Sequence, residues 1–152
     1  MEVELRPFAA HYGEVMAIAV TDAQERFLGE PSVAAFLADD DDHPTFTSYA
    51  VCDGDTVVGF ACYGQEVEHE LWRRWIPLVV VDRRYQGQGY GRALMEAIIR
   101  RVRAESPGCR AIGLSCKPQN VVAMRLYRSL RFVEDQANDR GGIDMWLALD
   151  PE

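Results

Sequence analysis

The chain has 152 residues, of which 48% are hydrophobic and 26% are charged, and its formal net charge is −8. This length suits one domain with a sizeable core, so we expect a single domain over residues 1–152. No apolar run approaches the roughly 20 residues that a membrane helix needs, so we expect no membrane association. The acidic balance and the lack of a basic face with interleaved aromatic residues exclude nucleic acid as the expected partner.

The charge is distributed unevenly along the chain. Residues 1–70 hold 2 Lys or Arg and 15 Asp or Glu, whereas residues 71–152 hold 14 and 9. Such asymmetry predicts two ligand fields on one domain, a basic one that suits phosphates and an acidic one that suits a cation. The alternative is that both halves only keep the surface soluble.

The four cysteines do not form a metal or disulfide pattern. No Cys-x-x-Cys pair and no histidine at zinc spacing are present, so we expect no metal site. The N-terminus lacks a basic region followed by an apolar one. We therefore expect a cytoplasmic protein with free thiols.

The N-terminal region predicts a short strand over residues 3–7 and a helix over residues 8–20. A second, shorter helix is expected from Ser32, a residue type favoured at N-caps. It ends in an acidic run made of Asp39, Asp40, Asp41 and Asp42. Four carboxylates at a helix C-terminus oppose the helix dipole, so the run is either a solvated loop or a binding site for a polycationic substrate.

The middle of the chain predicts three strands. Residues 45–53 and 56–64 are expected to pair antiparallel, because Asp53-Gly54-Asp55 is a tight hairpin signal. After a polar, acidic connection, residues 71–81 predict the next strand. Pro77 lies within it and cannot donate a hydrogen bond, so strand pairing must be interrupted near this residue.

A glycine-rich loop joins this strand to a helix expected over residues 90–103. The loop reads Gln86-Gly87-Gln88-Gly89-Tyr90-Gly91. Glycine permits positive φ and lets a ligand approach the main chain, and the first helical turn offers unpaired amides at the positive end of the dipole. The combination predicts an anion site that usually holds phosphate. Neither the Gly-Lys-Ser/Thr ending of a nucleotide-triphosphate loop nor the third glycine of a dinucleotide loop is present.

The last third of the chain predicts one helix and three strands. The strands are expected over residues 110–116, 132–135 and 143–149, and the helix over residues 120–130. Strands in mixed order with helices on both faces define an α/β (α+β) fold.

Two motifs resemble the GNAT superfamily of N-acetyltransferases. Its coenzyme A pyrophosphate loop, Gln/Arg-x-x-Gly-x-Gly/Ala, is matched by Gln86, Gly89 and Gly91. Its later signature, Asn-x-x-Ala-x-x-Leu-Tyr-x-x-x-Gly-Phe, is similar to residues 120–132 except that Arg131 replaces the glycine. This arginine leaves the helix C-cap without its preferred left-handed residue. Within the superfamily, residues 71–133 most resemble bacterial diamine, spermine and spermidine acetyltransferases.

The resemblance implies a fold and a cosubstrate. The fold is a mostly antiparallel seven-stranded sheet whose bulged fourth strand splays from its neighbour, and the cosubstrate is acetyl-CoA. The backbone of Val79 and Val81 is expected to pair with the pantetheine arm, and the amides of residues 87–92 to cradle the pyrophosphate. The residues expected to contact the coenzyme are Val79, Val81, Gln86, Gly87, Gln88, Gly89, Tyr90, Gly91, Arg92, Asn120 and Tyr127. Gln86 and Arg92 are expected to add side-chain donors, and Asn120 to serve as a helix N-cap as well.

Tyr127 matches the superfamily tyrosine whose phenol protonates the departing sulfur, which makes it the expected general acid. The alternative is a core tyrosine whose hydroxyl is satisfied by the backbone. Related polyamine enzymes often place a basic glutamate near the position of Pro77, which is not acidic here. Glu68 and Glu70 are therefore the candidates for the base or a water relay, and Glu66 is a further candidate for substrate binding. The alternative for each is a solvated loop charge.

The expected reaction is direct transfer of the acetyl group to a primary amine, without a covalent cysteine intermediate. The expected partner is a small polycationic amine such as a diamine or polyamine. The alternatives are an aminoglycoside- or streptothricin-like antibiotic, an amine of a protein or peptide, and a non-catalytic acetyl-CoA-binding module. Tyr127 argues against the last, because binding alone needs no acid for a thiolate. The resemblance is also compatible with a homodimer.

Overall fold

The computed structural model describes residues 1–18, 46–65 and 72–149. In chain order the elements are β1 (Glu4–Pro7), the 3₁₀ helix η1 (Phe8–His11), α1 (Tyr12–Met16), β2 (Phe46–Asp53), β3 (Thr56–Gly64), β4 (Arg73–Val81), the 3₁₀ helix η3 (Arg83–Tyr85), α4 (Tyr90–Glu105), β5 (Ala111–Cys116), α5 (Val121–Ser129), β6 (Val133–Ala137) and β7 (Ile143–Ala148). The described strands form one seven-stranded sheet in the order β1-β2-β3-β4-β5-β7-β6. Of the six described pairings only β4–β5 is parallel. The predicted mixed, mostly antiparallel sheet is confirmed.

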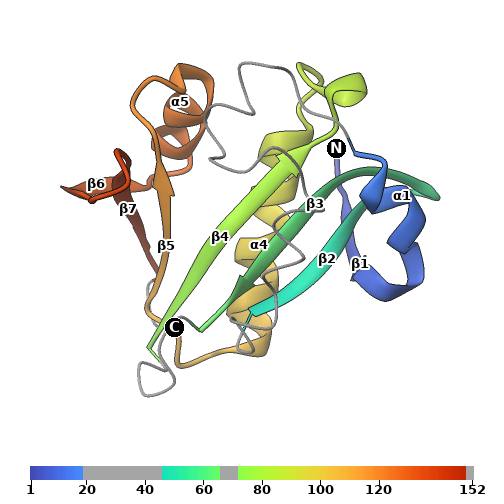
Figure 1. Cartoon of the computed structure of the whole chain (residues 1–152). Coiled ribbons are helices and arrows are strands. Elements are labelled where there is room, and N and C mark those ends of the chain that lie inside the picture. The colour runs from blue at the N-terminus through green and yellow to red at the C-terminus, as the bar shows by residue number, and fades with distance from the viewer. Residues whose placement is uncertain (19–45, 66–71, 150–152) are drawn as a thin grey trace.

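Helices pack on both faces of this sheet (Figure 1). The long helix α4 buries Leu94 and Ile98 in a large core on one face. The short helix α1 buries Val15 in a smaller core on the other face. Strand residues alternate between these two cores because successive side chains of a strand point to opposite faces.

One helix is much shorter than predicted. The pattern of residues 8–20 predicted a continuous helix, but His11 takes φ −129° and ψ 26°, which is not helical. The segment is therefore split into η1 and the five-residue α1, and the prediction of one helix is wrong. The helix expected from Ser32 lies outside the described residues, and the bounds of the other elements agree with prediction within two residues.

Strand β4 changes its pairing halfway along its length. Its pairing with β5 runs from Arg73 opposite Ala111 to Ile76 opposite Leu114 and continues no further. Along β3, Ile76 and Pro77 together stand opposite the single residue Tyr63, which is a β-bulge. Figure 1 shows β4 and β5 diverging toward the end of the sheet where α5 lies. The predicted interruption at Pro77, with a bulged and splayed fourth strand, is confirmed.

The bulge also exchanges the faces to which β4 presents its side chains. Before it, Ile76 belongs to the core beneath α4. After it, Leu78 and Val80 belong to the core beneath α1. The two halves of this strand therefore contribute to different cores.

Helix α5 ends on a residue of unusual conformation. Arg131 has a φ of 76° and is the one non-glycine residue with positive φ in the described ranges. Its N–H donates to the carbonyl of Arg128, and the N–H of Phe132 donates to that of Tyr127, both at 3.0 Å. These two bonds define the Schellman motif. Arg131 thus adopts the left-handed conformation for which glycine is the preferred residue.

Candidate active site

The divergence of β4 and β5 exposes an unpaired backbone edge of β4. The N–H of Asp82 donates to Val58 of β3 at 2.8 Å. Because the backbone groups of successive strand residues point to opposite sides, those of Val81 and Val79 point away from β3. Beyond Ile76 they face the side on which β5 is no longer paired. This is the edge predicted to pair with the pantetheine arm.

The glycine loop directly follows this edge and opens the long helix. Gly87 and Gly89 have φ values of 74° and 94°, a conformation that glycine adopts without strain. Gly89 is the N-cap of α4, and no side chain caps the helix there. The amides of the first turn of α4 therefore remain available to an anion.

Several loop side chains have partners within the protein. The amide of Gln86 donates to the carbonyl of Val81 at 2.9 Å, because this carbonyl has lost its strand partner and must be satisfied. The guanidinium of Arg92 donates to the hydroxyl of Ser129 at 2.5 Å and lies 3.6 Å from the carboxylate of Glu96. The roles of Gln86 and Arg92 as side-chain donors to the coenzyme stay predictions.

The other two polar loop side chains fasten the loop to its surroundings. The hydroxyl of Tyr90 donates to the carboxylate of Asp53, at the tip of the β2–β3 hairpin, at 2.5 Å. The amide of Gln88 donates to the carbonyl of Arg84 at 3.3 Å. These contacts hold the first residue of α4 and the loop before it in place.

Helix α5 packs beside the start of α4. A Cβ built on Gly91 would lie 3.4 Å from the side chain of Leu126, so glycine lets the two helices approach closely. At the start of α5, the side-chain oxygen of Asn120 accepts a hydrogen bond from the amide of Ala123 at 3.3 Å. The predicted N-cap role of Asn120 is confirmed. This packing sets α5, the helix that carries Tyr127, beside the start of α4.

Tyr127 of α5 is buried in the core beneath α4, close to Cys116 at the end of β5. Its residue is 8% exposed, and its ring packs against Phe132 at a centroid distance of 5.9 Å. Its hydroxyl has no hydrogen-bond partner among the described residues, and it is not one of the fully enclosed polar atoms that lack a partner there. Burial raises the pKa of Tyr127 well above its usual value, and the nearby Cys116 adds to the increase.

Cys116 lies at the end of β5 and is unsuited to nucleophilic catalysis. Burial raises the pKa of its thiol to about 11, although Arg128 acts in the opposite direction. The thiol contacts the carbonyl of Lys117 at 3.6 Å. Because the thiolate is the nucleophilic form, this cysteine is almost wholly unreactive at neutral pH.

A polar cluster that the sequence analysis missed lies on the other side of the sheet at the same end. Ser115, the first residue of β5 beyond its pairing with β4, stands opposite Asp144 of β7. The amide of Asn138 donates to the Ser115 hydroxyl at 2.7 Å and to the Asp144 carboxylate at 3.0 Å. Ser115 and Asp144 alternate with core residues along their strands, which is the sequence signal that they face away from α4 and α5.

The remaining predicted site residues cannot be placed. The acidic run Asp39, Asp40, Asp41 and Asp42, the substrate candidate Glu66 and the base candidates Glu68 and Glu70 all lie outside the described residues. These assignments stay predictions.

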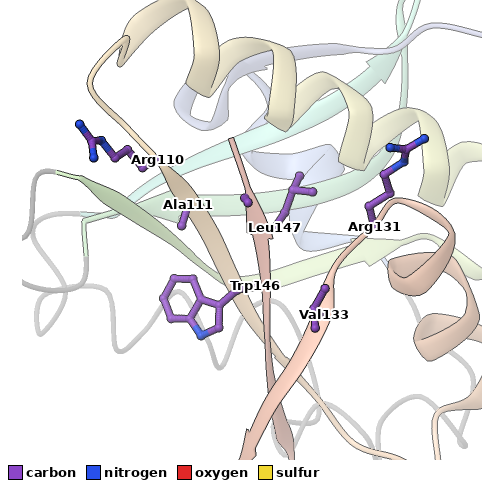
Figure 2. Close-up of a pocket in the computed structure, with 7 residues that line it drawn as sticks. Arg110, Ala111, Arg131, Val133, Trp146 and Leu147 are labelled. Atoms are coloured by element: carbon purple, nitrogen blue, oxygen red, sulfur yellow. The ribbon is translucent and has the colours of Figure 1, made fainter. Parts of the chain in front are cut away.

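A cleft in the described part of the chain lies at the opposite end of β5. It measures about 400 Å³ and is lined by Arg110, Ala111, Arg131, Val133, Trp146, Leu147 and Ala148. Figure 2 shows the guanidinium groups of Arg110 and Arg131 pointing away from each other. They do not converge on one ligand. The cleft also lies away from the ends of β4 and β5 that splay apart, so the candidate active site is not there.

Within residues 1–18, 46–65 and 72–149 no three metal-ligating side chains form a cluster. The described helices are all too short or too polar to cross a membrane.

The sequence and the fold were compared with known proteins. The family model of the acetyltransferase (GNAT) family matches residues 12–132. The chain belongs to this family. The GNAT assignment made from the two motifs is thus confirmed.

Among curated relatives, this GNAT chain is 37% identical to the spermine/spermidine N(1)-acetyltransferase of Bacillus subtilis (strain 168) over 84 residues. That match spans 53% of the chain and 54% of the relative, so the chain spans about half the length of the curated relatives it matches.

Solved structures resemble the whole fold. A spermidine N-acetyltransferase from Vibrio cholerae, in complex with CoA and spermine, has a TM-score of 0.76 at 16% identity and covers 97% of this chain and 95% of its own. The aminoglycoside acetyltransferase AAC(6')-Ib in complex with coenzyme A has a TM-score of 0.71 at 18% identity, with 97% and 94% covered. At these identities the likeness shows the fold alone.

Proposed function

We propose that this chain transfers the acetyl group of acetyl-CoA directly to a primary amine. One observation carries the proposal: the open amides of the glycine loop directly follow the unpaired edge of β4, at the end of the sheet where α5, the helix that carries Tyr127, also lies (Figure 1). Amides at a helix start suit a diphosphate, and an unpaired strand edge suits an extended arm that contains amide groups. The residues present therefore fit acetyl-CoA, which would supply a reactive thioester when it is bound.

Tyr127 is proposed as the general acid. A departing thiolate is helped by a group that donates a proton at the right place. The raised pKa of the phenol keeps it protonated throughout the neutral range, and its hydroxyl has no described partner that would compete for the proton. The high pKa of the Cys116 thiol supports direct transfer rather than a covalent step on this cysteine.

The acceptor must lose a proton before it can attack. An alkyl ammonium with a pKa near about 10.4 requires on the order of 4–5 kcal/mol to reach its neutral form at pH 7. Glu68 and Glu70 remain the proposed base or water relay. We further propose that Asp144 contacts the ammonium groups of the substrate. It lies on β7 opposite Ser115 of β5, the strand that borders the gap.

A polyamine or diamine is the proposed acceptor. The 37% identity to a spermine/spermidine N(1)-acetyltransferase supports this substrate class, as does the excess of 13 acidic residues over basic ones within residues 1–70. We also propose that acidic residues of this N-terminal part lie close to the bound amine.

The first test is a panel of amines scored for release of free thiol from acetyl-CoA. Spermidine, spermine and short diamines are expected to be turned over more efficiently than aminoglycosides, streptothricin or peptides. If an antibiotic or a peptide is preferred, the substrate class is wrong although the chemistry is right. Background rates with every amine, together with no calorimetric binding of acetyl-CoA, would remove the proposed function.

The second test is Tyr127→Phe, with the exposed Tyr12→Phe as the matched control. Loss of a general acid is expected to lower kcat by roughly 10²–10⁴-fold, while the Kd for CoA changes little. The wild-type enzyme is expected to show no loss of kcat up to about pH 10, because burial holds the phenol pKa above its usual value. Full turnover in the Tyr127→Phe variant would assign the acid to another group.

A further inference from the structure

An anchored arginine stands immediately before the glycine loop. Asp82 is 1% exposed and is the one buried charged residue in the described ranges. Its carboxylate accepts from the backbone N–H of Arg84 at 3.0 Å, from Nε at 3.2 Å and from Nη2 at 3.1 Å. The last two contacts join both carboxylate oxygens to one edge of the guanidinium, which is the bidentate geometry of strong ion pairs.

This pairing fixes the direction in which Arg84 points. A buried carboxylate requires partners, and the bidentate contact with Asp82 holds the guanidinium in this direction. The Arg84 side chain is nevertheless 64% exposed. Arginine carries five N–H donors, and those on the edge away from Asp82 face outward. The pair has no net charge, but its positive end is held at the surface.

The contacts of Arg84 connect it to the loop that is proposed to hold the diphosphate. Its guanidinium carbon lies 5.3 Å from the ring centroid of Tyr85, and that ring meets Tyr90, the first residue of α4, edge-on at 6.1 Å. Its carbonyl accepts a hydrogen bond from the Gln88 side chain. The neighbouring Arg83 makes no side-chain ion pair or hydrogen bond with the described residues, and so it is not held in one direction.

We propose that Arg84 binds a phosphate of the coenzyme through its outward N–H groups, and that Asp82 is the residue that positions it. The inference rests on the proposed binding of acetyl-CoA. A guanidinium that is already fixed loses little side-chain freedom on binding, which favours a directional contact with a phosphate. Two groups of the coenzyme share this chemistry, the pyrophosphate and the phosphate on the ribose 3′-oxygen.

The test is calorimetric titration of CoA and 3′-dephospho-CoA into the wild type, Arg84→Gln and Arg83→Gln. Loss of a charge-assisted phosphate contact is expected to weaken CoA binding about tenfold or more, whereas Arg83→Gln should change it less than twofold. If the loss is seen with CoA and not with 3′-dephospho-CoA, the partner is the 3′-phosphate. An equal loss with both identifies the pyrophosphate. Either pattern supports the proposal.

Folding is controlled with a second variant. Because Arg84→Gln removes a charged partner of a buried carboxylate, the double variant Asp82→Asn with Arg84→Gln is measured as well, and it is expected to fold and to show the same weakened binding. Asp82→Asn alone should weaken CoA binding while Arg84 keeps its charge, and in turnover the effect should appear in KM for acetyl-CoA rather than in kcat. Wild-type affinity in the double variant, or an equal loss in Arg83→Gln, would overturn the role of Arg84. If the wild type binds neither ligand, the proposed function itself fails.

Discussion

Replacement of Arg131 by glycine is expected to make the protein more stable. In the structure this arginine has a φ of 76°, where the Cβ of an L-residue crowds the backbone at a cost of roughly 1–2 kcal/mol. Glycine removes that strain but loses more conformational freedom on folding, which offsets roughly 0.5–1 kcal/mol. The net expectation for Arg131→Gly is stabilisation by about 0.5–1 kcal/mol, which corresponds to about 1–4 °C in Tm for a chain of this size.

The matched control is Arg131→Ala. Alanine lacks the guanidinium but keeps the Cβ, so it retains the backbone strain and is expected to gain nothing. Both variants and the wild type are unfolded in urea at pH 7 and followed by tryptophan fluorescence, with the midpoint compared at constant slope. If Arg131→Gly is no more stable than Arg131→Ala, the left-handed conformation of residue 131 does not carry the strain inferred here.

Three further predictions concern the sheet and the site. A Cβ on Gly113 would lie 2.6 Å from the ring of Trp146 and 2.7 Å from that of Trp75. Gly113→Ala should therefore lower the free energy of unfolding by about 1–3 kcal/mol and alter the tryptophan fluorescence. An unchanged urea midpoint would contradict this. Asp144→Asn should raise KM for spermidine several-fold and leave the Kd for CoA unchanged, and an unaltered KM would remove Asp144 from the acceptor site. Burial raises the pKa of Cys116 to about 11, whereas an unfolded thiol titrates near about 8.5. The unfolded state therefore loses its proton first, and the free energy of unfolding should fall by about 1.5 kcal/mol between pH 8.5 and pH 10. The Cys116→Ala variant should show a smaller fall, and an equal fall in both proteins would refute this reasoning.

The periodic parts of the fold could be predicted because burial dictates their sequence pattern. The strand pattern of residues 56–64 matches β3 at both ends. Pro77 indicated where strand pairing stops, since it lacks the N–H that a ladder needs, and the structure places the bulge there. Residues 8–20 were misjudged because their apolar spacing suits a helix, while the break at His11 is a backbone feature with no signature in that spacing.

The candidate site was predictable where it depends on the backbone and less so where it depends on side chains. The glycines indicated the turn and the open amides, and the structure gives Gly87 and Gly89 the expected positive φ. The partner of Gln86 could not be predicted, because it is a carbonyl left open by the divergence of two strands. Asp82 was overlooked because an acidic residue after a strand is usually solvated, and only the three-dimensional structure shows it enclosed.

The extra residue in β4 determines both the course of this strand in the sheet and the presence of the candidate active site. Ile76 and Pro77 share one partner on β3. This extra residue directs the backbone groups of Val79 and Val81 toward the gap between β4 and β5. Removing one of the two residues would let the ladder close, but it would also rotate every later side chain of the strand into the wrong core. A single deletion in β4 therefore cannot produce a continuous sheet without disturbing the cores. The packing on both faces of the sheet requires that the bulge be retained.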